Sequence, residues 1–284
     1  MSAPRTGRPR LALRSFLVSV FSLVLALVPL GAAPASAAGP LPRVMASTGD
    51  SITRAFDVGW CCVLRDSPSR SWSTGWNTGV YSHYRRLLTA APQLAGNNHN
   101  DARSGAKMAD LDGQLSAAAT QKAEYVTILM GANDVCTSTT STMTPTATFE
   151  NQFRTALGAF TAARPHARVF VSSIPDIYRL WFLLHTNWLA VATWKTFGIC
   201  QSMLSTSNTE QQRQQVAAQE AADNAALQRV CSAFTQCRWD GYATYSTAFS
   251  AQDVSTVDYY HPSVTGQNHL AAVTWAAGYW PSIG

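Results

Sequence analysis

The sequence predicts one α/β domain in which a mostly parallel sheet is covered by helices on both faces. Continuous apolar runs such as residues 125–130 are typical of strands that are buried on both sides. Amphipathic stretches such as residues 148–163 alternate with these runs, and this alternation is typical of parallel strands joined by helices. About 246 residues, 39–284, follow an N-terminal leader, and this length is enough for one large core.

Each expected element follows from its local composition. Strands are expected at residues 43–48, 97–103, 125–130, 168–173 and 238–245. Helices are expected at residues 80–88, 107–119, 148–163, 209–234 and 266–277. Residues 55–76 are rich in Gly, Ser, Trp and Cys and lack helical periodicity, which predicts a long loop of the kind that is usually functional. A second loop is expected at residues 254–262, before the final helix.

Residues 1–38 have the features of a secretory signal peptide. Four arginines lie within the first 14 residues, and residues 16–30 form a mostly apolar core. An A-x-A cleavage site ends at Ala37. The apolar core is short for a membrane span, which needs about 20 residues, and no Arg-Arg pair precedes it, which favours the general secretory route. We therefore expect a secreted, extracellular protein whose mature domain is residues 39–284.

The charge of the mature chain disfavours binding to nucleic acid. The whole sequence has 21 Lys and Arg against 16 Asp and Glu, a net charge of +5. Four of the arginines and none of the acids lie in the leader, so the mature chain carries 17 against 16, or +1. A nearly neutral surface has no large positive field to attract nucleic acid. We expect a monomer with no nucleic-acid partner.

All six cysteines follow the leader, and an even number in an oxidising compartment favours disulfides. They are Cys61, Cys62, Cys136, Cys200, Cys231 and Cys237. A zinc site is disfavoured because the chain has no Cys-x-x-Cys pair with a nearby histidine. The last two cysteines could close a short loop between a helix and the next strand, which would leave the middle two as a long-range pair. The adjacent first two would form a vicinal bridge or stay free, and the pairing is left open.

The stretch Gly49-Asp50-Ser51 follows the first expected strand, where the chain turns toward its next element. The carboxyl ends of parallel strands are where α/β proteins gather their sites. A serine there can lie near N–H groups whose partial positive charge favours an oxyanion. Two more strands end in small or polar residues, at Gly105 and Asn133, and we expect all three ends to line one edge. Taken alone, the stretch would also suit a turn with a helix cap.

Asp258-Tyr259-Tyr260-His261 precedes the final helix and supplies the partners that a serine nucleophile needs. A hydroxyl is a poor nucleophile until a base removes its proton, and histidine is the usual base near neutral pH. Asp258 lies three residues before His261, so it can turn back to hold the second ring nitrogen and stabilise the imidazolium. Ser51, His261 and Asp258 are therefore the expected catalytic residues.

The tetrahedral intermediate of acyl transfer also needs hydrogen-bond donors, and the loss of one donor can cost about a hundredfold in rate. The N–H groups of Ser51 and Gly105 and the side-chain amide of Asn133 are the candidates for this oxyanion hole. Asp50 and Asp134 are expected to support their turns by hydrogen bonding and to take no part in acid–base chemistry.

Four blocks of the chain, in this order, resemble the SGNH hydrolases, also called GDSL esterases and lipases. The blocks are G-D-S at 49–51, Gly105, G-A-N-D at 131–134 and D-Y-Y-H-P at 258–262. The resemblance covers roughly residues 43–280. It implies a flavodoxin-like three-layer α/β/α sandwich and the residue roles given above. It also implies ester hydrolysis by a serine nucleophile, with no metal and no cofactor.

Two further stretches resemble the phospholipase B branch of that family: S-W-S-T-G at 71–75 and V-T-I-L-M-G-A-N-D-V-C at 126–136. This resemblance implies that the substrates are fatty-acyl esters of phospholipids or lysophospholipids. The chain departs from lipid-active relatives in two places, because isoleucine follows Ser51 and two cysteines are adjacent at 61–62. The alternatives are a carbohydrate O-deacetylase on the same scaffold and a secreted binding protein that has lost turnover.

Residues 177–199 are unusually aromatic and allow two interpretations. Apolar residues recur there at helical steps: Ile177, Trp181, Leu184, Trp188 and Val191. Such a stripe is most often part of the core. The additional Trp194 and Phe197 favour a second interpretation, in which the segment is an acyl-binding wall or a lid in transient contact with lipid.

Overall fold

The structure is a computed structural model that describes residues 1–4 and 40–283 of the chain. Residues 5–38 of the expected leader, including the expected cleavage site, lie outside the described residues. Residues 40–283 belong to a single folded unit.

A wholly parallel sheet of five strands forms the centre of this unit, in the order β2-β1-β3-β4-β5. The strands are β1 (Met45–Gly49), β2 (Asn98–Asn100), β3 (Tyr125–Leu129), β4 (Arg168–Val171) and β5 (Cys237–Trp239). β3 is buried along its whole length, as its continuous apolar sequence predicts for a central strand. Gly49 pairs with Leu129, so β1 and β3 end at the same edge of the sheet. This strand order is that of the flavodoxin-like fold.

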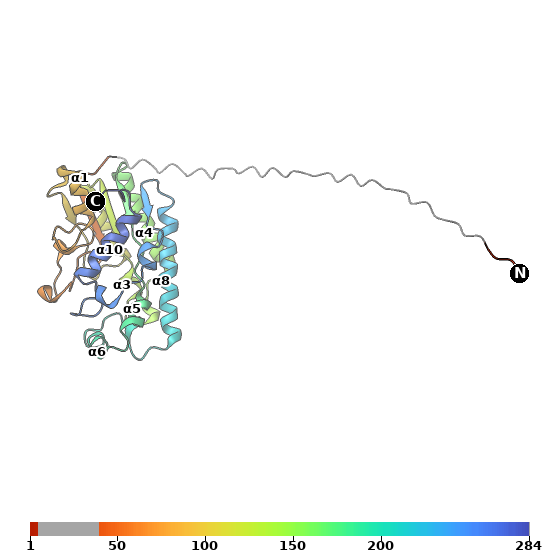
Figure 1. Cartoon of the computed structure of the whole chain (residues 1–284). Coiled ribbons are helices and arrows are strands. Elements are labelled where there is room, and N and C mark those ends of the chain that lie inside the picture. The colour runs from red at the N-terminus through yellow and green to blue at the C-terminus, as the bar shows by residue number, and fades with distance from the viewer. Residues whose placement is uncertain (5–39, 284) are drawn as a thin grey trace. The chain divides into compact units, whose positions relative to one another are not determined.

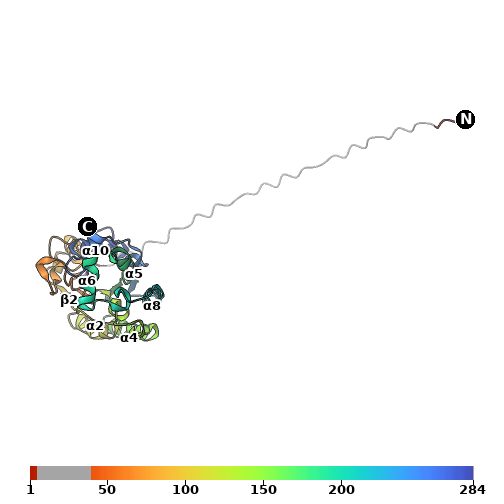
Figure 2. The same cartoon turned by 90° about the horizontal axis from the view of Figure 1, so that it is seen from below.

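Long helices cover both faces of the sheet. One face carries α1 (His83–Ala90) and α10 (Val264–Ala277), and the other carries α2 (Leu111–Thr120), α4 (Thr146–Ala163) and α8 (Glu210–Cys231). Figure 2 shows α10 on the opposite side from α2 and α4. The expected three-layer α/β/α sandwich is therefore confirmed.

The remaining helices lie mainly at the carboxyl edge of the sheet, toward the lower end of the folded unit in Figure 1. They are α3 (Ala132–Val135), α5 (Ile177–Leu184), α6 (Trp188–Phe197), α7 (Gln201–Leu204) and α9 (Ala243–Ser246). Short 3-10 turns occupy residues 60–62, 68–70, 92–94, 108–110, 140–142 and 251–253. Among the described residues, no helix is both long enough and apolar enough to cross a membrane.

The loop expected at residues 55–76 is confirmed, but its last part has a structural role. Ser73 Oγ lies 2.6 Å from Thr127 Oγ1 of β3, and Thr74 Oγ1 lies 2.9 Å from Ser47 Oγ of β1. All four side chains are buried. The S-W-S-T-G stretch is therefore buried against β1 and β3 and is not exposed at the surface.

The last strand is shorter than the sequence predicts. β5 ends at Trp239, and residues 240–245, which were expected to continue it, form a turn and the start of α9. The reason is Asp240, whose carboxylate accepts the N–H groups of Tyr242 and Thr244 and so folds the backbone back on itself. Gly241 supplies the required positive φ of 68°.

The aromatic segment 177–199 forms two helices, so the single apolar stripe is interrupted. α5 ends at Leu184, and the side chain of Asn187 accepts the first N–H groups of α6 as a helix cap. Because the helix is broken here, residues after the break no longer point to the same side as those before it. The expected buried stripe therefore includes Leu184, which is buried, but not Trp188, which is 75% exposed. Trp194, interpreted as a candidate wall or lid residue, is instead part of the core.

All six cysteines are paired. The pairs are Cys61–Cys62, Cys136–Cys200 and Cys231–Cys237. The short-range and long-range pairs that the sequence suggested are both present, and the adjacent cysteines form the vicinal bridge. The vicinal bridge lies in the loop that follows Ser51, and the long-range pair joins the end of α3 to α7.

Candidate active site

Glycine at position 49 sets the place of Ser51. Gly49 has φ +143°, and a Cβ added there would collide with the carbonyl oxygen of Leu129 and the hydroxyl of Thr53. Only glycine fits this conformation and this close approach. The chain therefore turns sharply at the end of β1, and Ser51 stands at the turn with 8% of its surface exposed.

Two buried glutamines from opposite faces of the sheet fix the backbone on both sides of Ser51. Gln114 of α2 accepts the Gly49 N–H at 2.7 Å and donates to the Gly49 carbonyl at 2.9 Å. Gln267 of α10 donates to the Ile52 carbonyl at 2.7 Å. Sequence reasoning missed both residues, because a single glutamine within a helix has no pattern that could reveal this role.

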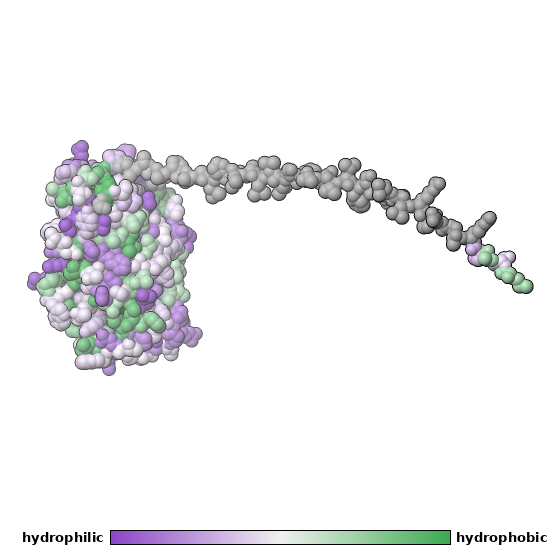
Figure 3. All heavy atoms as spheres, viewed as in Figure 1, coloured by the Kyte–Doolittle hydropathy of each residue, from purple (hydrophilic) through white to green (hydrophobic). Residues whose placement is uncertain are grey.

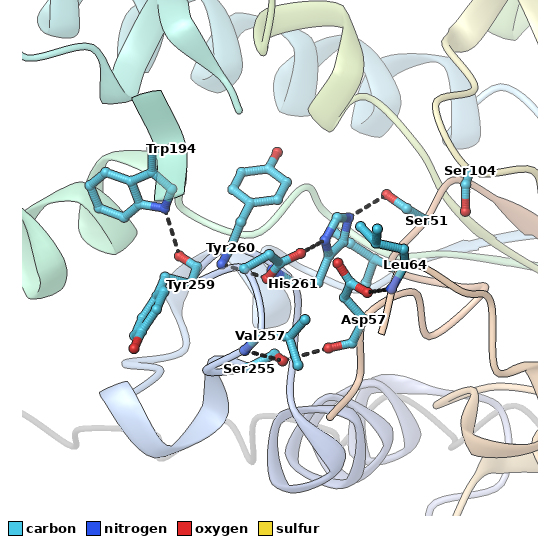
Figure 4. A network of polar contacts seen from close by, with 12 residues as sticks. Ser51, Asp57, Leu64, Ser104, Trp194, Ser255, Val257, Tyr259, Tyr260 and His261 are labelled. Carbon is cyan, nitrogen blue, oxygen red and sulfur yellow. Dashed lines mark hydrogen bonds and ion pairs between the residues drawn. The ribbon is translucent and has the colours of Figure 1, made fainter. Parts of the chain in front are cut away.

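Ser51, His261 and Asp258 form one chain of hydrogen bonds, part of which is drawn in Figure 4. His261 Nε2 lies 2.8 Å from Ser51 Oγ, and His261 Nδ1 lies 2.5 Å from Asp258 Oδ2. With the Nδ1 proton donated to the carboxylate, Nε2 is the nitrogen that can accept the serine proton. The structure thus brings the three expected residues together in the order that nucleophilic catalysis requires.

The loop that carries Asp258 is fixed by its own hydrogen bonds. Asp258 Oδ1 accepts the N–H groups of Tyr260 and His261, each at 3.0 Å. Burial by itself would raise the pKa of the Asp258 carboxyl, but its hydrogen bond to His261 and these N–H groups together lower that pKa below its ordinary value. Asp258 is therefore an ionised group that can stabilise the imidazolium. The rings of Phe56 and Tyr260 pack edge-on against the His261 ring and restrict its orientation.

The three expected oxyanion donors lie in the segments that follow β1, β2 and β3, which are parallel neighbours in the sheet. The backbone N–H groups of Ser51 and Gly105 donate to no residue in the described part of the chain. Asn133, in α3, donates one Nδ2 hydrogen to the Ala106 carbonyl at 2.9 Å, and this fixes its amide beside Gly105. The second Nδ2 hydrogen remains for a ligand. Two backbone donors and one side-chain donor are thus available for a developing oxyanion.

Asp57 is a second carboxyl group at the site that sequence reasoning missed. It is only 2% exposed, and its Oδ1 accepts the Leu64 N–H. Its side chain lies next to that of Asp258, and its backbone carbonyl accepts the Ser255 hydroxyl at 2.5 Å. Figure 4 shows the Asp57 carboxyl below the His261 ring. No sequence pattern identifies it, because its position depends on a backbone with φ +49° in an irregular loop.

Burial raises the pKa of Asp57, and the charge of the neighbouring Asp258 raises it further, although the Leu64 N–H acts in the opposite direction. Because the pKa of Asp57 is raised and that of Asp258 is lowered, Asp57 is the member of this pair that takes up a proton first as the pH falls.

Other buried acids near the site have structural roles, as expected. Asp50 Oδ1 accepts the Ile52 N–H at 2.9 Å, and burial raises the pKa of Asp50 to about 7. Asp134 Oδ2 accepts the Met108 N–H at 2.9 Å and so supports the turn after β3. Within residues 1–4 and 40–283, no group of three or more His, Cys, Asp or Glu side chains is arranged to hold a metal ion.

A largely apolar cavity of about 90 Å³ lies next to the catalytic loops. Its walls include Ile52, Tyr260 and Pro262, which are direct sequence neighbours of Ser51 and His261. The side chains of α5 form another wall, including Leu180 and Leu183. The surroundings of the site on this side are therefore hydrophobic.

The flavodoxin-like sheet, with a hydrogen-bonded serine, histidine and aspartate at its carboxyl edge, is the architecture of an SGNH hydrolase. The family model described as GDSL-like Lipase/Acylhydrolase matches residues 48–269, which is most of the sequence. The chain belongs to this family of hydrolases. A search of the curated proteins found no match.

Solved structures with the same fold include a protein from Parabacteroides merdae ATCC 43184 described as a GDSL-like lipase. It is 15% identical, with a TM-score of 0.50, over 82% of this chain and 94% of that one. Phospholipase A1 from Streptomyces albidoflavus NA297 is 17% identical, with a TM-score of 0.48, over 82% and 98% of the two chains. A family 3 carbohydrate esterase from Clostridium thermocellum is 14% identical, with a TM-score of 0.46, over 82% and 93%. At these identities the likeness is one of fold alone.

Proposed function

We propose that this protein is a secreted serine hydrolase that cleaves carboxylic esters through an acyl-enzyme. The observation that carries the proposal is the continuous hydrogen-bonded chain from Ser51 Oγ through His261 to Asp258. A nucleophile, a base and a group that orients the base are the parts that acyl transfer requires.

In the first half of the reaction, Ser51 Oγ attacks the ester carbonyl while His261 Nε2 takes its proton. The N–H groups of Ser51 and Gly105 and the Asn133 amide stabilise the oxyanion. His261 then donates the proton to the leaving alcohol, and the acyl-enzyme remains. In the second half, His261 removes a proton from water, which attacks the acyl carbonyl; the bond to Ser51 Oγ then breaks, His261 returns the proton to Ser51 Oγ, and the acid is released. Asp258 stabilises the imidazolium in both halves.

We propose a lipid ester, with a phospholipid or lysophospholipid as the substrate class. The resemblance of residues 71–75 and 126–136 to the phospholipase B branch supports this choice, and so does the apolar cavity beside the loops of Ser51 and His261. A site built for an acetylated sugar would instead need polar groups that bind hydroxyls. The carbohydrate deacetylase is therefore the second candidate.

Two measurements test the proposal. A fluorophosphonate probe should label the wild-type protein at Ser51 and should not label Ser51→Ala, which should also lose ester hydrolysis. Full hydrolysis by Ser51→Ala would refute the mechanism. A panel of phosphatidylcholine, lysophosphatidylcholine, short-chain esters and acetylated sugars then distinguishes the substrates, because a preference for acetylated sugars over all lipids would identify a deacetylase.

We further propose that residues 1–38 direct export and are removed. Three disulfides in the folded unit support an oxidising destination. N-terminal sequencing of the exported protein should begin near residue 39, and retention of the full chain inside the cell would contradict this.

A further inference from the structure

The vicinal bridge lies in a loop that is closed by Asp57. The Asp57 N–H donates to the Arg65 carbonyl at 3.2 Å, and Asp57 Oδ1 accepts the Leu64 N–H. We call residues 57–65, which these two hydrogen bonds close, the cysteine loop, because the bridge joins Cys61 to Cys62 within it. The position of the Asp57 side chain therefore depends on the shape of this loop.

Three contacts join the cysteine loop to the loop that carries the histidine. The Asp57 carbonyl accepts the Ser255 hydroxyl at 2.5 Å, and the Asp57 side chain lies next to that of Asp258 (Figure 4). The indole N–H of Trp60 donates to Thr256 Oγ1 at 3.2 Å. A change in the cysteine loop therefore reaches the carboxylate that orients the histidine.

The two sulfurs of the vicinal bridge have different surroundings. Cys61 is exposed, whereas the other five cysteines are buried or half-buried. In Figure 1 the cysteine loop, in orange, lies at the outer left edge of the folded unit, and Figure 3 shows that edge as a mixture of hydrophilic and hydrophobic surface. Cys62 is only 6% exposed, and Arg70 Nη1 donates to its sulfur at 3.6 Å. A solvent thiol can therefore reach Cys61 first.

This asymmetry defines the direction in which a dithiol reductant opens the bridge. One thiolate of the reductant attacks the Cys61 sulfur, the bond between the two cysteine sulfurs breaks, and Cys62 leaves as a thiolate beside the Arg70 guanidinium, which stabilises its charge. The second thiol of the reductant then displaces Cys61 from the mixed disulfide. The dithiol is oxidised to a disulfide, and both of its protons and two electrons pass to the cysteines.

Opening this bridge leaves the rest of the fold connected, because it closes no long stretch of chain. Its cysteines are adjacent, whereas the Cys136–Cys200 bridge spans 64 positions. The Cys62 side chain packs with Ala55 and Val58 in a small hydrophobic cluster that is separate from the main core. Reduction therefore releases the cysteine loop and leaves the sheet and its covering helices in place.

We propose that the Cys61–Cys62 bridge is a redox switch: a dithiol reductant opens it with Arg70 stabilising the leaving thiolate, the cysteine loop relaxes, and turnover at Ser51 falls. The effect on turnover rests on the proposed function, whereas reduction of the bridge is measured without turnover. The switch keeps turnover low in a reducing compartment and permits full turnover in an oxidising one, which is the destination proposed above.

The first test treats the wild-type protein with increasing dithiothreitol, followed by iodoacetamide and peptide mass spectrometry. Cys61 and Cys62 should be alkylated before the other four cysteines. In samples reduced in parallel but not alkylated, kcat on a soluble ester should fall at least about fivefold as this bridge opens, with KM nearly unchanged, because His261 loses its fixed orientation. Circular dichroism should stay the same, and reoxidation should restore kcat.

Earlier alkylation of any other cysteine pair would overturn the proposal, and so would an unchanged kcat after the vicinal bridge has opened. The Cys61→Ser/Cys62→Ser protein should have the kcat of the reduced wild type and should not respond to mild dithiothreitol. Hydrolysis by the untreated wild-type protein tests the proposed function separately, and the order of alkylation tests the bridge whatever that result is.

The role of Arg70 is tested by the rate at which the vicinal bridge is reduced. Arg70→Gln should slow this reduction about threefold or more, and Arg70→Lys should restore much of the rate because it keeps a cation near the leaving sulfur. Arg65→Gln is the matched control, since Arg65 is an exposed cation at the end of the same loop. Equal rates in Arg70→Gln and Arg65→Gln would overturn the role given to Arg70.

Discussion

His261 Nε2 lies 2.8 Å from Ser51 Oγ, although the two residues are 210 positions apart in the sequence. Ser51 follows the first strand, and His261 precedes the last helix. The contact exists because α10 directly follows the His261 loop and its Gln267 is hydrogen-bonded to Ile52, directly after the serine. The geometry of the site therefore depends on the packing of the covering helices against the whole sheet.

Asp258→Asn should lower kcat about a thousandfold or more and change KM little, because the amide removes the charge that stabilises the imidazolium and favours the wrong ring tautomer. Steady-state kinetics on a soluble ester measure this. Asp253→Asn is the matched control, since Asp253 also contacts a histidine, with Oδ1 at 3.2 Å from His269 Nδ1. The control should keep nearly full activity. Equal losses in the two variants would mean that the Asp258 effect is structural.

Asn133→Ala should lower kcat about a hundredfold with an unchanged KM, because the amide is expected to act only on the oxyanion of the transition state. The backbone donors of Ser51 and Gly105 remain, so residual activity is expected. Fluorophosphonate labelling of Ser51 should persist at a lower rate. A rise in KM with an unchanged kcat would instead assign Asn133 to substrate binding.

Asp57→Asn should retain more activity than Asp57→Ala. The asparagine keeps an oxygen for the Leu64 N–H and offers an N–H toward Asp258, whereas alanine provides neither. Steady-state kinetics on a soluble ester compare the two variants. Equal losses of kcat in both variants would mean that the polar atoms of Asp57 are not what supports Asp258.

The sequence was sufficient to predict that Ser51, His261 and Asp258 lie together, because they occur in short blocks with fixed chemistry. Strand ends at Ser51, Gly105 and Asn133 must meet at one edge of a parallel sheet, and Asp258 needs only a single turn to reach His261. These constraints are local or topological. They do not require knowledge of any packed side chain.

The residues that sequence reasoning missed act through tertiary packing. Gln114 and Gln267 touch the serine loop only after two helices have docked on opposite faces of the sheet. Asp57 reaches Asp258 only through a loop with positive φ. The division of residues 177–199 into two helices could be predicted in part, because Asn187 is a typical helix cap. The apolar periodicity on both sides of Asn187 nevertheless suggested a single continuous stripe.

Asp50→Asn should stabilise the protein at pH 8 and leave its stability nearly unchanged at pH 4. Burial raises the pKa of Asp50 from 3.8 to about 7, so the folded chain holds a proton that the unfolded chain has lost between these values. Stability therefore falls as pH rises through this window, by on the order of 4 kcal/mol. The asparagine cannot ionise and still accepts the Ile52 N–H. Urea unfolding of both proteins at both pH values measures the free energy of unfolding. An equal effect of the substitution at pH 4 and pH 8 would contradict the raised pKa of Asp50.

Removing the Cys136–Cys200 disulfide should cost more stability than removing Cys231–Cys237. The first pair spans 64 positions and the second spans 6, so the first restricts the unfolded chain much more. Loop-closure entropy predicts losses of about 4 and about 2 kcal/mol for the two double alanine variants. Urea unfolding under non-reducing conditions provides the comparison.

The same pair should also affect turnover, because Cys136 directly follows α3, which carries Asn133, and the Tyr260 hydroxyl lies 3.1 Å from its sulfur. The Cys136/Cys200 variant should therefore show a lower kcat at temperatures where it is still folded, since both the oxyanion donor and the histidine loop lose a fixed neighbour. The Cys231/Cys237 variant serves as the control and should keep its kcat, because that bridge joins α8 to β5 away from Ser51. A lower kcat in both variants, or in neither, would show that the Cys136–Cys200 bridge contributes to stability alone.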